Sequence, residues 1–206
     1  MKKFITLLLI VFLAWGYSKA QHNDNQLHFL QCSHAKIGNL KHTTKQQEQT
    51  PLLHNYDVRF YFLDLNVSDV STYISGNVRI DAMVRSAILD TFAFELIEEL
   101  TIDSIVFRGA NSVFIRNGDE VFVPLEEAIQ EGDSFSTLIY YYGQPPATPF
   151  FSGIDTEYSE QWDTYVTWTL SEPFNAKLWW PTKQVLNDKA DSVWVFLTTD
   201  ESNLAG

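Results

Sequence analysis

Cysteine is almost absent from this sequence: Cys32 is the only one among 206 residues, so no internal disulfide can form. Basic residues are also scarce, with 14 Lys and Arg against 26 Asp and Glu and a formal net charge of −12. A chain this acidic repels phosphate groups and anionic lipid heads. We therefore expect neither nucleic acid nor a membrane as a partner. Stability must come from a core, for which 45% of the residues are hydrophobic.

Histidine is confined to the first part of the chain, at positions 22, 28, 34, 42 and 54. Without an HExxH pair, a gluzincin-type zinc site cannot form, and the later residues offer no histidine base for a Ser or Cys triad. His28, Cys32 and His34 lack a fourth well-placed ligand, so a solvated segment is favoured over a metal site. The sequence therefore predicts no catalytic residue and no metal ligand in this chain.

The first twenty residues have the three regions of a secretory signal. Lys2 and Lys3 precede an apolar run from Phe4 to Trp15, and Ser18-Lys19-Ala20 has small residues at the positions that a signal peptidase reads. The apolar run is too short to favour a membrane anchor. We expect residues 1–20 to be a signal peptide cleaved after Ala20, and the protein to be secreted or periplasmic. Residues 21–52 are polar and are interpreted as a lead-in segment, with one short helix around residues 34–47.

From residue 53 onward, apolar and polar residues alternate in short runs, which predicts half-buried strands. In the first run the alternation slips by one residue after Phe62, which indicates a bulge. Asn117-Gly118 separates two apolar runs and predicts a tight hairpin. Further strands are predicted at 165–170 and 193–197. Residues 53–206 are thus predicted to form one all-β domain, an antiparallel β-sandwich or bent two-sheet domain.

The segment between Gly143 and Glu160 contains three prolines and predicts a loop without regular structure. Its acidic residues Asp155, Glu157 and Glu160 could supply the carboxylate pair of a glycosidase. A solvated acidic surface is the simpler interpretation of these three side chains.

One segment is dense in aromatic, charged and turn residues: Trp168-Thr-Leu-Ser-Glu172-Pro-Phe-Asn-Ala-Lys177-Leu-Trp-Trp-Pro181. It resembles the signature in the N-terminal domain of the aminopeptidase N family of zinc metallopeptidases (gluzincins), in which a Glu-Pro pair precedes a basic residue and an aromatic-Pro step. The continuation 188–192 resembles the secreted bacterial branch of that family, and 54–58 and 73–80 resemble its first two strands. The resemblance covers about residues 53–203.

The resemblance implies a role for Glu172. In that family the matching glutamate reaches into the active-site cleft and binds the free α-ammonium group of a peptide substrate. A carboxylate facing an ammonium group in a partly desolvated cleft forms a charge-assisted hydrogen bond. The resemblance also implies that zinc and the catalytic residues belong to a C-terminal catalytic domain of the same polypeptide, so this chain alone is expected to hydrolyse nothing.

Two features limit the match. Lys177 stands where many relatives have arginine, and Thr182 and Gln184 stand where many have a cysteine and an acid.

Trp168, Trp179 and Trp180 are expected to pack structurally rather than to stack on a ligand. An alternative remains a self-standing secreted β-sandwich module that binds protein or glycan through the aromatic region from Trp162 to Trp180.

Overall fold

The computed structural model describes residues 49–146 and 153–201, and within them the regular structure is strands and two short 3-10 helices. The helices are η2 (Pro51–Asn55) and η3 (Ala176–Leu178). The strands are β1 (Tyr56–Val67), β2 (Ile74–Val84), β3 (Ile88–Glu95), β4 (Thr101–Phe107), β5 (Ala110–Ser112), β6 (Ile115–Asn117), β7 (Glu120–Gln130), β8 (Ser134–Gly143), β9 (Gly153–Ser159), β10 (Thr164–Leu170) and β11 (Ser192–Thr198). The all-β prediction is confirmed.

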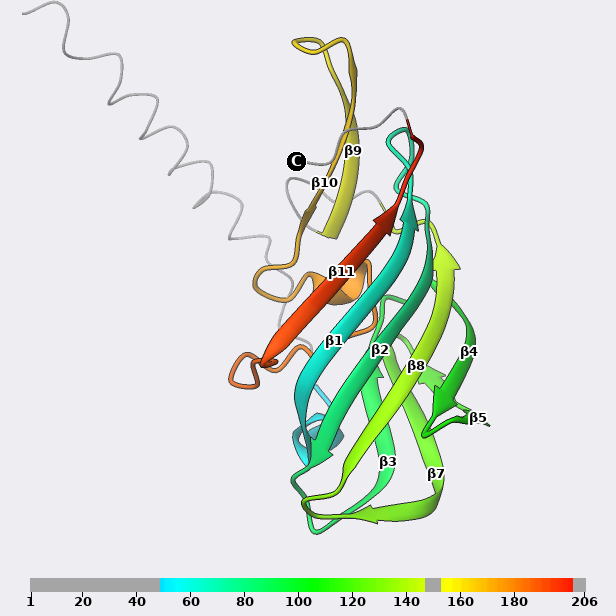
Figure 1. The fold of residues 1–206 in the computed structure, drawn as a ribbon, viewed down its shortest axis with the longest axis vertical. Helices are drawn as coiled ribbons and strands as arrows, with labels where there is room; N and C mark the ends of the chain where they lie inside the picture. The colour runs from blue at the N-terminus through cyan, green and yellow to red at the C-terminus, as the bar shows by residue number, and fades with distance from the viewer. Residues whose placement is uncertain (1–48, 147–152, 202–206) are drawn as a thin grey trace, which may run out of the picture. The chain divides into compact units, whose positions relative to one another are not determined.

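The largest sheet has six strands in the order β11-β1-β2-β8-β4-β5, and Figure 1 shows the first four of these side by side. Every neighbouring pair in it is antiparallel except β1 and β11, which are parallel. The predicted antiparallel arrangement therefore holds for every pair of this sheet except the one at this edge. The long connection from residue 171 to 191 returns the chain to the end at which β1 begins, so β11 runs in the same direction as β1.

A three-stranded sheet, β3-β7-β6, forms the second layer, and one core lies between the two sheets. Phe92 on β3 lies 5.4 Å from Phe135 on β8 and 5.7 Å from Phe107 on β4, measured between ring centroids. These contacts cross from the small sheet to the large one. Because both layers contribute buried rings to one apolar cluster, the domain is a β-sandwich, as predicted.

The predicted bulge exists in β1, but it lies earlier than the sequence pattern indicated. The register between β1 and β2 shifts between Val58 and Phe60, not after Phe62. Consequently Tyr61, Leu63 and Leu65 point into the core. Phe60 and Phe62 lie on the opposite face, where the guanidinium of Arg79 lies over both rings, at 5.2 and 5.6 Å from their centroids.

The predicted hairpin turn is confirmed. Asn117 on β6 pairs with Glu120 on β7, and Gly118 between them has a φ of 59°, a conformation that glycine adopts without strain.

The loop prediction for residues 143–160 is wrong in its second half, because β9 occupies 153–159 and pairs with β10 as a two-stranded sheet. The prolines lie before this strand, and β-branched and aromatic residues within it favour extended backbone. Across the pair, the hydroxyl groups of Thr156 and Thr167 are hydrogen bonded at 2.8 Å. The strand predicted at 165–170 is confirmed as β10.

Several predictions lie outside the described residues: the signal peptide over 1–20, nearly all of the lead-in segment over 21–52, and its short helix. The last residues of that segment, Gln49 to Leu52, are described and contact the sandwich. Among the described residues, no helix has the length and apolar character needed to cross a membrane.

Candidate functional site

Glu172 lies in a turn that directly follows β10, at the start of a connecting segment that we call the 171–191 segment. The backbone N–H of Asn175 donates to the carbonyl of Ser171 at 2.9 Å, and its side-chain amide donates to the carbonyl of Glu172 at 2.8 Å. The peptide bond between Glu172 and Pro173 is cis. The turn residues themselves thus satisfy the backbone carbonyls on both sides of the Glu172 side chain.

The base of the β9–β10 hairpin packs against this segment at Gly153. A Cβ atom at Gly153 would lie 2.8 Å from the Cβ of Leu178, and the φ of this glycine is 72°. Both observations require glycine at this position. The close approach fixes where β10 ends, and therefore where the turn with Glu172 begins.

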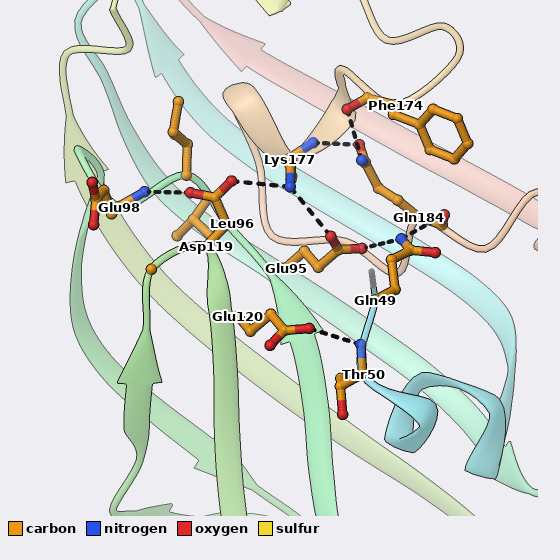
Figure 2. Close-up of polar contacts among 12 residues, drawn as sticks. Gln49, Thr50, Glu95, Leu96, Glu98, Asp119, Glu120, Phe174, Lys177 and Gln184 are labelled. Atoms are coloured by element: carbon orange, nitrogen blue, oxygen red, sulfur yellow. Dashed lines mark hydrogen bonds and ion pairs between the residues drawn. The ribbon is translucent and has the colours of Figure 1, made fainter. Parts of the chain in front are cut away.

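A cluster of polar side chains, drawn in Figure 2, contacts the 171–191 segment and holds it in place. The ammonium group of Lys177 lies 3.3 Å from a carboxylate oxygen of Glu95 and 2.9 Å from one of Asp119. The other oxygen of Glu95 accepts a hydrogen bond from the side chain of Gln49 at 2.7 Å. Only 4% of the Glu95 side chain is exposed. A carboxylate this deeply buried is tolerated because each oxygen has a donor.

Gln184 joins this cluster to the turn. Its side-chain amide donates to the carbonyl of Phe174 at 2.7 Å, and its amide oxygen accepts from the backbone N–H of Lys177 at 2.8 Å. Both bonds are drawn in Figure 2. Gln184 therefore links two backbone positions within five residues of Glu172.

Backbone hydrogen bonds attach the same segment to the end of β3. Glu95 and Thr182 exchange two N–H to carbonyl bonds of 2.8 and 2.9 Å, and Ile97 donates to the carbonyl of Lys177 at 2.8 Å. The segment thus extends the small sheet by one bridge. Together with the contacts of the buried Glu95 carboxylate, these bonds fix the 171–191 segment against the end of β3.

The electrostatic surroundings keep Lys177 charged. Burial would lower the pKa of its ammonium group, but the hydrogen bond to Asp119 and the negative charges of Glu95 and Asp119 raise it above its ordinary value. The cation that holds both carboxylates is therefore retained at neutral pH.

A second cluster holds the far end of the segment. The ammonium group of Lys183 pairs with Asp188, donates to the carbonyl of Tyr56 and lies 4.6 Å from the centroid of the Tyr56 ring. The backbone N–H of Lys183 donates to the hydroxyl of Tyr61 at 3.1 Å. Burial lowers the pKa of Lys183, whereas it raises that of Tyr61 to about 12. This cluster connects the segment to β1.

Two tryptophans of the motif, Trp179 and Trp180, pack as predicted. Trp179 is buried, its indole N–H donates to the hydroxyl of Ser171 at 3.2 Å, and its carbonyl accepts from the hydroxyl of Tyr141 at 2.9 Å. The ring of Trp180 stands edge-on to that of Tyr61 at 4.9 Å. Trp162, by contrast, is 65% exposed between β9 and β10. Tyr158 and Tyr165 on the same hairpin are 44% and 46% exposed, and their rings stand edge to face at 5.3 Å. The exposed aromatic rings of this region therefore lie on the β9–β10 hairpin rather than at Trp179 and Trp180.

The side chain of Glu172 differs from these neighbours in having no partner among the described residues. Glu172 is exposed, and among the described residues its only hydrogen bond is the one that its backbone carbonyl accepts from the Asn175 side chain. A carboxylate free of protein donors can accept hydrogen bonds from an external cation. The turn holds the backbone of Glu172, so only the side chain has to be ordered when it binds.

Sequence reasoning identified Glu172 and Lys177 but not the residues that support them. Glu95 ends β3 and lies within the apolar run Phe92–Ile97, and its partners Gln49 and Lys177 are distant in sequence. Gln184 stands out in the sequence only as a difference from the aminopeptidase N family. A charged residue inside an otherwise apolar run is the signal that points to Glu95, because such a residue requires a buried partner.

Within residues 49–146 and 153–201, no group of three or more His, Cys, Asp or Glu side chains is arranged to hold a metal ion. The acidic residues Asp155, Glu157 and Glu160 lie on and just after β9. His28, Cys32 and His34 fall outside the described residues. The described residues therefore do not supply a zinc site.

No protein-family model matches this chain, and no curated protein matches it by sequence. Solved structures do match. A two-domain M1 zinc metallopeptidase, in a mutant form bound to L-arginine, aligns with a TM-score of 0.63 and 21% identity over 72% of this chain and 33% of that chain. An M1 zinc metallopeptidase from Deinococcus radiodurans aligns with a TM-score of 0.60 and 20% identity, over 70% and 32%.

Leukotriene A4 hydrolase from Saccharomyces cerevisiae matches as well, with a TM-score of 0.58 and 15% identity over 78% of this chain and 27% of that chain. The chain thus spans about a third or less of these proteins. Its described residues have the fold of one part of the M1 zinc metallopeptidases. The resemblance to the aminopeptidase N family is therefore confirmed at the level of the fold.

Proposed function

We propose that this chain is the N-terminal, substrate-positioning part of an exported zinc aminopeptidase, in which Glu172 binds the free amino terminus of a peptide. The observation that carries this proposal is an exposed carboxylate without a described partner, on a turn held by the half-buried Lys177 and the buried Gln184. The proposal assigns recognition to this chain. It assigns zinc and the bond-breaking residues to a C-terminal catalytic domain of the same polypeptide.

The electrostatics favour an ammonium ligand. An ammonium group donates up to three hydrogen bonds, and a carboxylate accepts them without having to lose a proton at neutral pH. Charge-assisted bonds of this kind contribute about 1.5–3 kcal/mol. A neutral, acylated amino terminus has neither the charge nor the donors, so a site built on Glu172 selects for exopeptidase substrates.

The ligands of matched structures agree with this chemistry. One M1 zinc metallopeptidase was solved with L-arginine, another with L-tryptophan, and a third with a Tyr-Ser-Ala substrate. Amino acids and unblocked peptides of this kind carry a free α-amino group. The proposed ligand of Glu172 is the same group.

The test compares two variants with the wild type, in the longer polypeptide that contains this chain. We expect the Glu172→Gln variant to lower kcat/KM for an unblocked peptide amide by about tenfold to a hundredfold, because the neutral amide loses the charge of the hydrogen bond. Glu126→Gln, at an exposed position on β7, is the matched control and should leave kcat/KM unchanged. Equal kcat/KM for the wild type and Glu172→Gln would reject the assignment.

A second experiment tests whether the catalytic centre lies outside this chain. The chain of 206 residues alone should release no amino acid from a peptide amide, whereas the longer polypeptide should do so until a chelator removes zinc. Chelator-sensitive release by the shorter chain would show that the catalytic centre has been assigned to the wrong part.

A further inference from the structure

The β9–β10 hairpin carries exposed aromatic rings close to its turn. Tyr158 on β9 and Tyr165 on β10 are directly paired, so both side chains project from the same face of the hairpin. Trp162, in the turn between the strands, is more exposed than either tyrosine. Two exposed acidic residues, Glu160 and Asp163, lie in the same turn. We call these five residues the hairpin tip. Exposed rings gathered in this way mark an interaction surface, whereas single exposed rings do not.

The base of the hairpin is anchored to the domain, and the tip is held in one arrangement. Ile154, at the start of β9, is 2% exposed and belongs to the core of the sandwich. The hydroxyl of Thr167 on β10 donates to the carbonyl of Ser68 at 3.0 Å. Within the tip, the hydroxyl of Tyr158 donates to the carboxylate of Asp163. A surface that is already ordered loses little conformational entropy when a ligand binds to it.

The carboxylates of the tip lack basic partners. Within residues 49–146 and 153–201, neither Glu160 nor Asp163 forms an ion pair, whereas Asp57 in the body of the domain pairs with both Arg59 and Arg85. Residues 117–176 contain no Lys, Arg or His at all. The hairpin and the turn that follows it therefore carry uncompensated negative charge, which attracts cations.

Lysine and arginine side chains match both properties of the tip. Their cationic groups form charge-assisted hydrogen bonds with carboxylates and lie favourably over aromatic faces, of which tryptophan is the best. Acidic partners are repelled, and these include a second copy of this chain, whose formal net charge is −12. A neutral glycan would stack on the rings without offsetting the negative charge. Charge complementarity therefore favours a basic polypeptide as the ligand.

The position of the tip suggests which basic polypeptide binds there. Strand β10 leads from the tip to the turn that carries Glu172, and Tyr165 precedes Glu172 by seven residues. At the rise of an extended strand this separation is at most about 25 Å. An extended peptide of about eight residues spans the same distance. A peptide that is longer than this, and whose amino terminus lies at Glu172, can therefore also contact the tip.

We propose that the hairpin tip is a second binding surface for the peptide substrate, which contacts lysine or arginine side chains about eight residues after the amino terminus. This inference rests on the proposed function, which assigns the amino terminus itself to Glu172. It adds a preference for long, basic peptides to the requirement for a free amino group.

A pair of peptides measures this preference in the longer polypeptide that contains this chain. Both are unblocked ten-residue amides that begin with six alanines, and one ends in four lysines, the other in four glutamines. We expect kcat/KM to favour the lysine peptide by about tenfold at low salt and by much less at about 0.5 M salt, because exposed charges are screened. Six-residue peptides with two alanines and the same four-residue ends should differ by less than about twofold. An equal preference at both lengths would overturn the proposal.

Variants of the tip locate the preference on the structure. The double variant Glu160→Gln/Asp163→Asn should reduce it to about twofold or less. Asparagine tolerates the φ of 52° at position 163. Glu126→Gln/Glu127→Gln, at exposed positions on β7, removes the same charge and should keep the full preference. Trp162→Leu should lower it by about twofold to fivefold, because the cation–π contact is lost. Equal losses in the two double variants would contradict the proposal.

An N-acetylated form of the ten-residue lysine peptide separates this inference from the proposed function, because it has no free amino group for Glu172. Its binding to the longer polypeptide, measured by calorimetry, should weaken about tenfold in Glu160→Gln/Asp163→Asn. Such binding in a polypeptide that releases no amino acid would refute only the assigned activity. An active enzyme that cleaves the lysine and glutamine peptides equally would refute only the role of the tip. A dimer that dissociates in Trp162→Leu would also refute it, because the occupant would then be a second copy.

Discussion

Two glutamates beside the 171–191 segment have opposite surroundings. Glu95 is 3% exposed and has a donor at each carboxylate oxygen, one from Lys177 and one from Gln49. Glu172 is exposed and its carboxylate has no partner among the described residues. The first carboxylate is committed to holding the segment in place, whereas the second is available to a ligand. The stability of the fold and the recognition of substrate should therefore depend on different glutamates.

The buried ion pair provides the largest expected effect. Replacing Lys177 by Met should destabilise the protein by about 3–5 kcal/mol, because Glu95 and Asp119 would remain buried or half-buried without their cation. Urea unfolding of the wild type and the variant measures this difference. The matched control is Lys189→Met, at an exposed residue of the same segment. If Lys177→Met and Lys189→Met were equally stable, the cluster below the turn would have no structural role.

The second cluster should contribute less. Tyr61→Phe removes the hydroxyl that accepts the backbone N–H of Lys183, and a buried donor left unsatisfied costs about 1–3 kcal/mol. The difference in unfolding free energy from wild type checks this expectation. Tyr73→Phe, at a residue that is 47% exposed, is the control and should be neutral. An unchanged unfolding free energy for Tyr61→Phe would mean that another group satisfies the Lys183 N–H.

The sequence predicts the strands well where one face is buried, and less well where long-range contacts determine the register or the pairing of a strand. The alternation in β2 is sufficient because its apolar residues, except Met83, face the core. In β1, however, Phe60 and Phe62 are apolar but lie outside the core, so the bulge was placed too late. The parallel pairing of β11 depends on how the 171–191 segment crosses the sandwich, and no local pattern encodes that.

The site was predicted only in part, for a similar reason. Glu172 was identified from a local motif and the resemblance that the motif carries. Glu95 depends on Lys177, which is 82 residues away, and on Gln49, which is 46 residues away. Pairings at such separations are consequences of the folded structure. The exposed glutamate, Glu172, can therefore be identified from the sequence, whereas the partners of the buried Glu95 cannot.

Acid should weaken a surface ion-pair group at the start of β1 by a smaller amount. Burial raises the pKa of Asp57, but the hydrogen bond from Arg85 and the charges of Arg85 and Arg59 lower it below the ordinary value of 3.8. Its contribution is therefore complete above pH 3.8 and is lost as the pH falls through the lower pKa of the folded state. We expect Asp57→Asn to remove at most about 1 kcal/mol of this acid dependence, measured as unfolding free energy against pH. An identical pH profile for the variant would show that other carboxylates account for the acid sensitivity.

The smallest expected change in stability belongs to the residue with the largest proposed role in recognition. Glu172→Gln should alter the unfolding free energy by less than about 0.5 kcal/mol, because the side chain is exposed and has no described partner to lose. Urea unfolding should show overlapping curves for the variant and the wild type, while kcat/KM for unblocked peptides falls in the longer polypeptide. If Glu172→Gln instead destabilised the fold as much as Lys177→Met, Glu172 would be a second structural glutamate. Any loss of activity would then follow from a displaced turn rather than from a missing charge at the substrate's amino terminus.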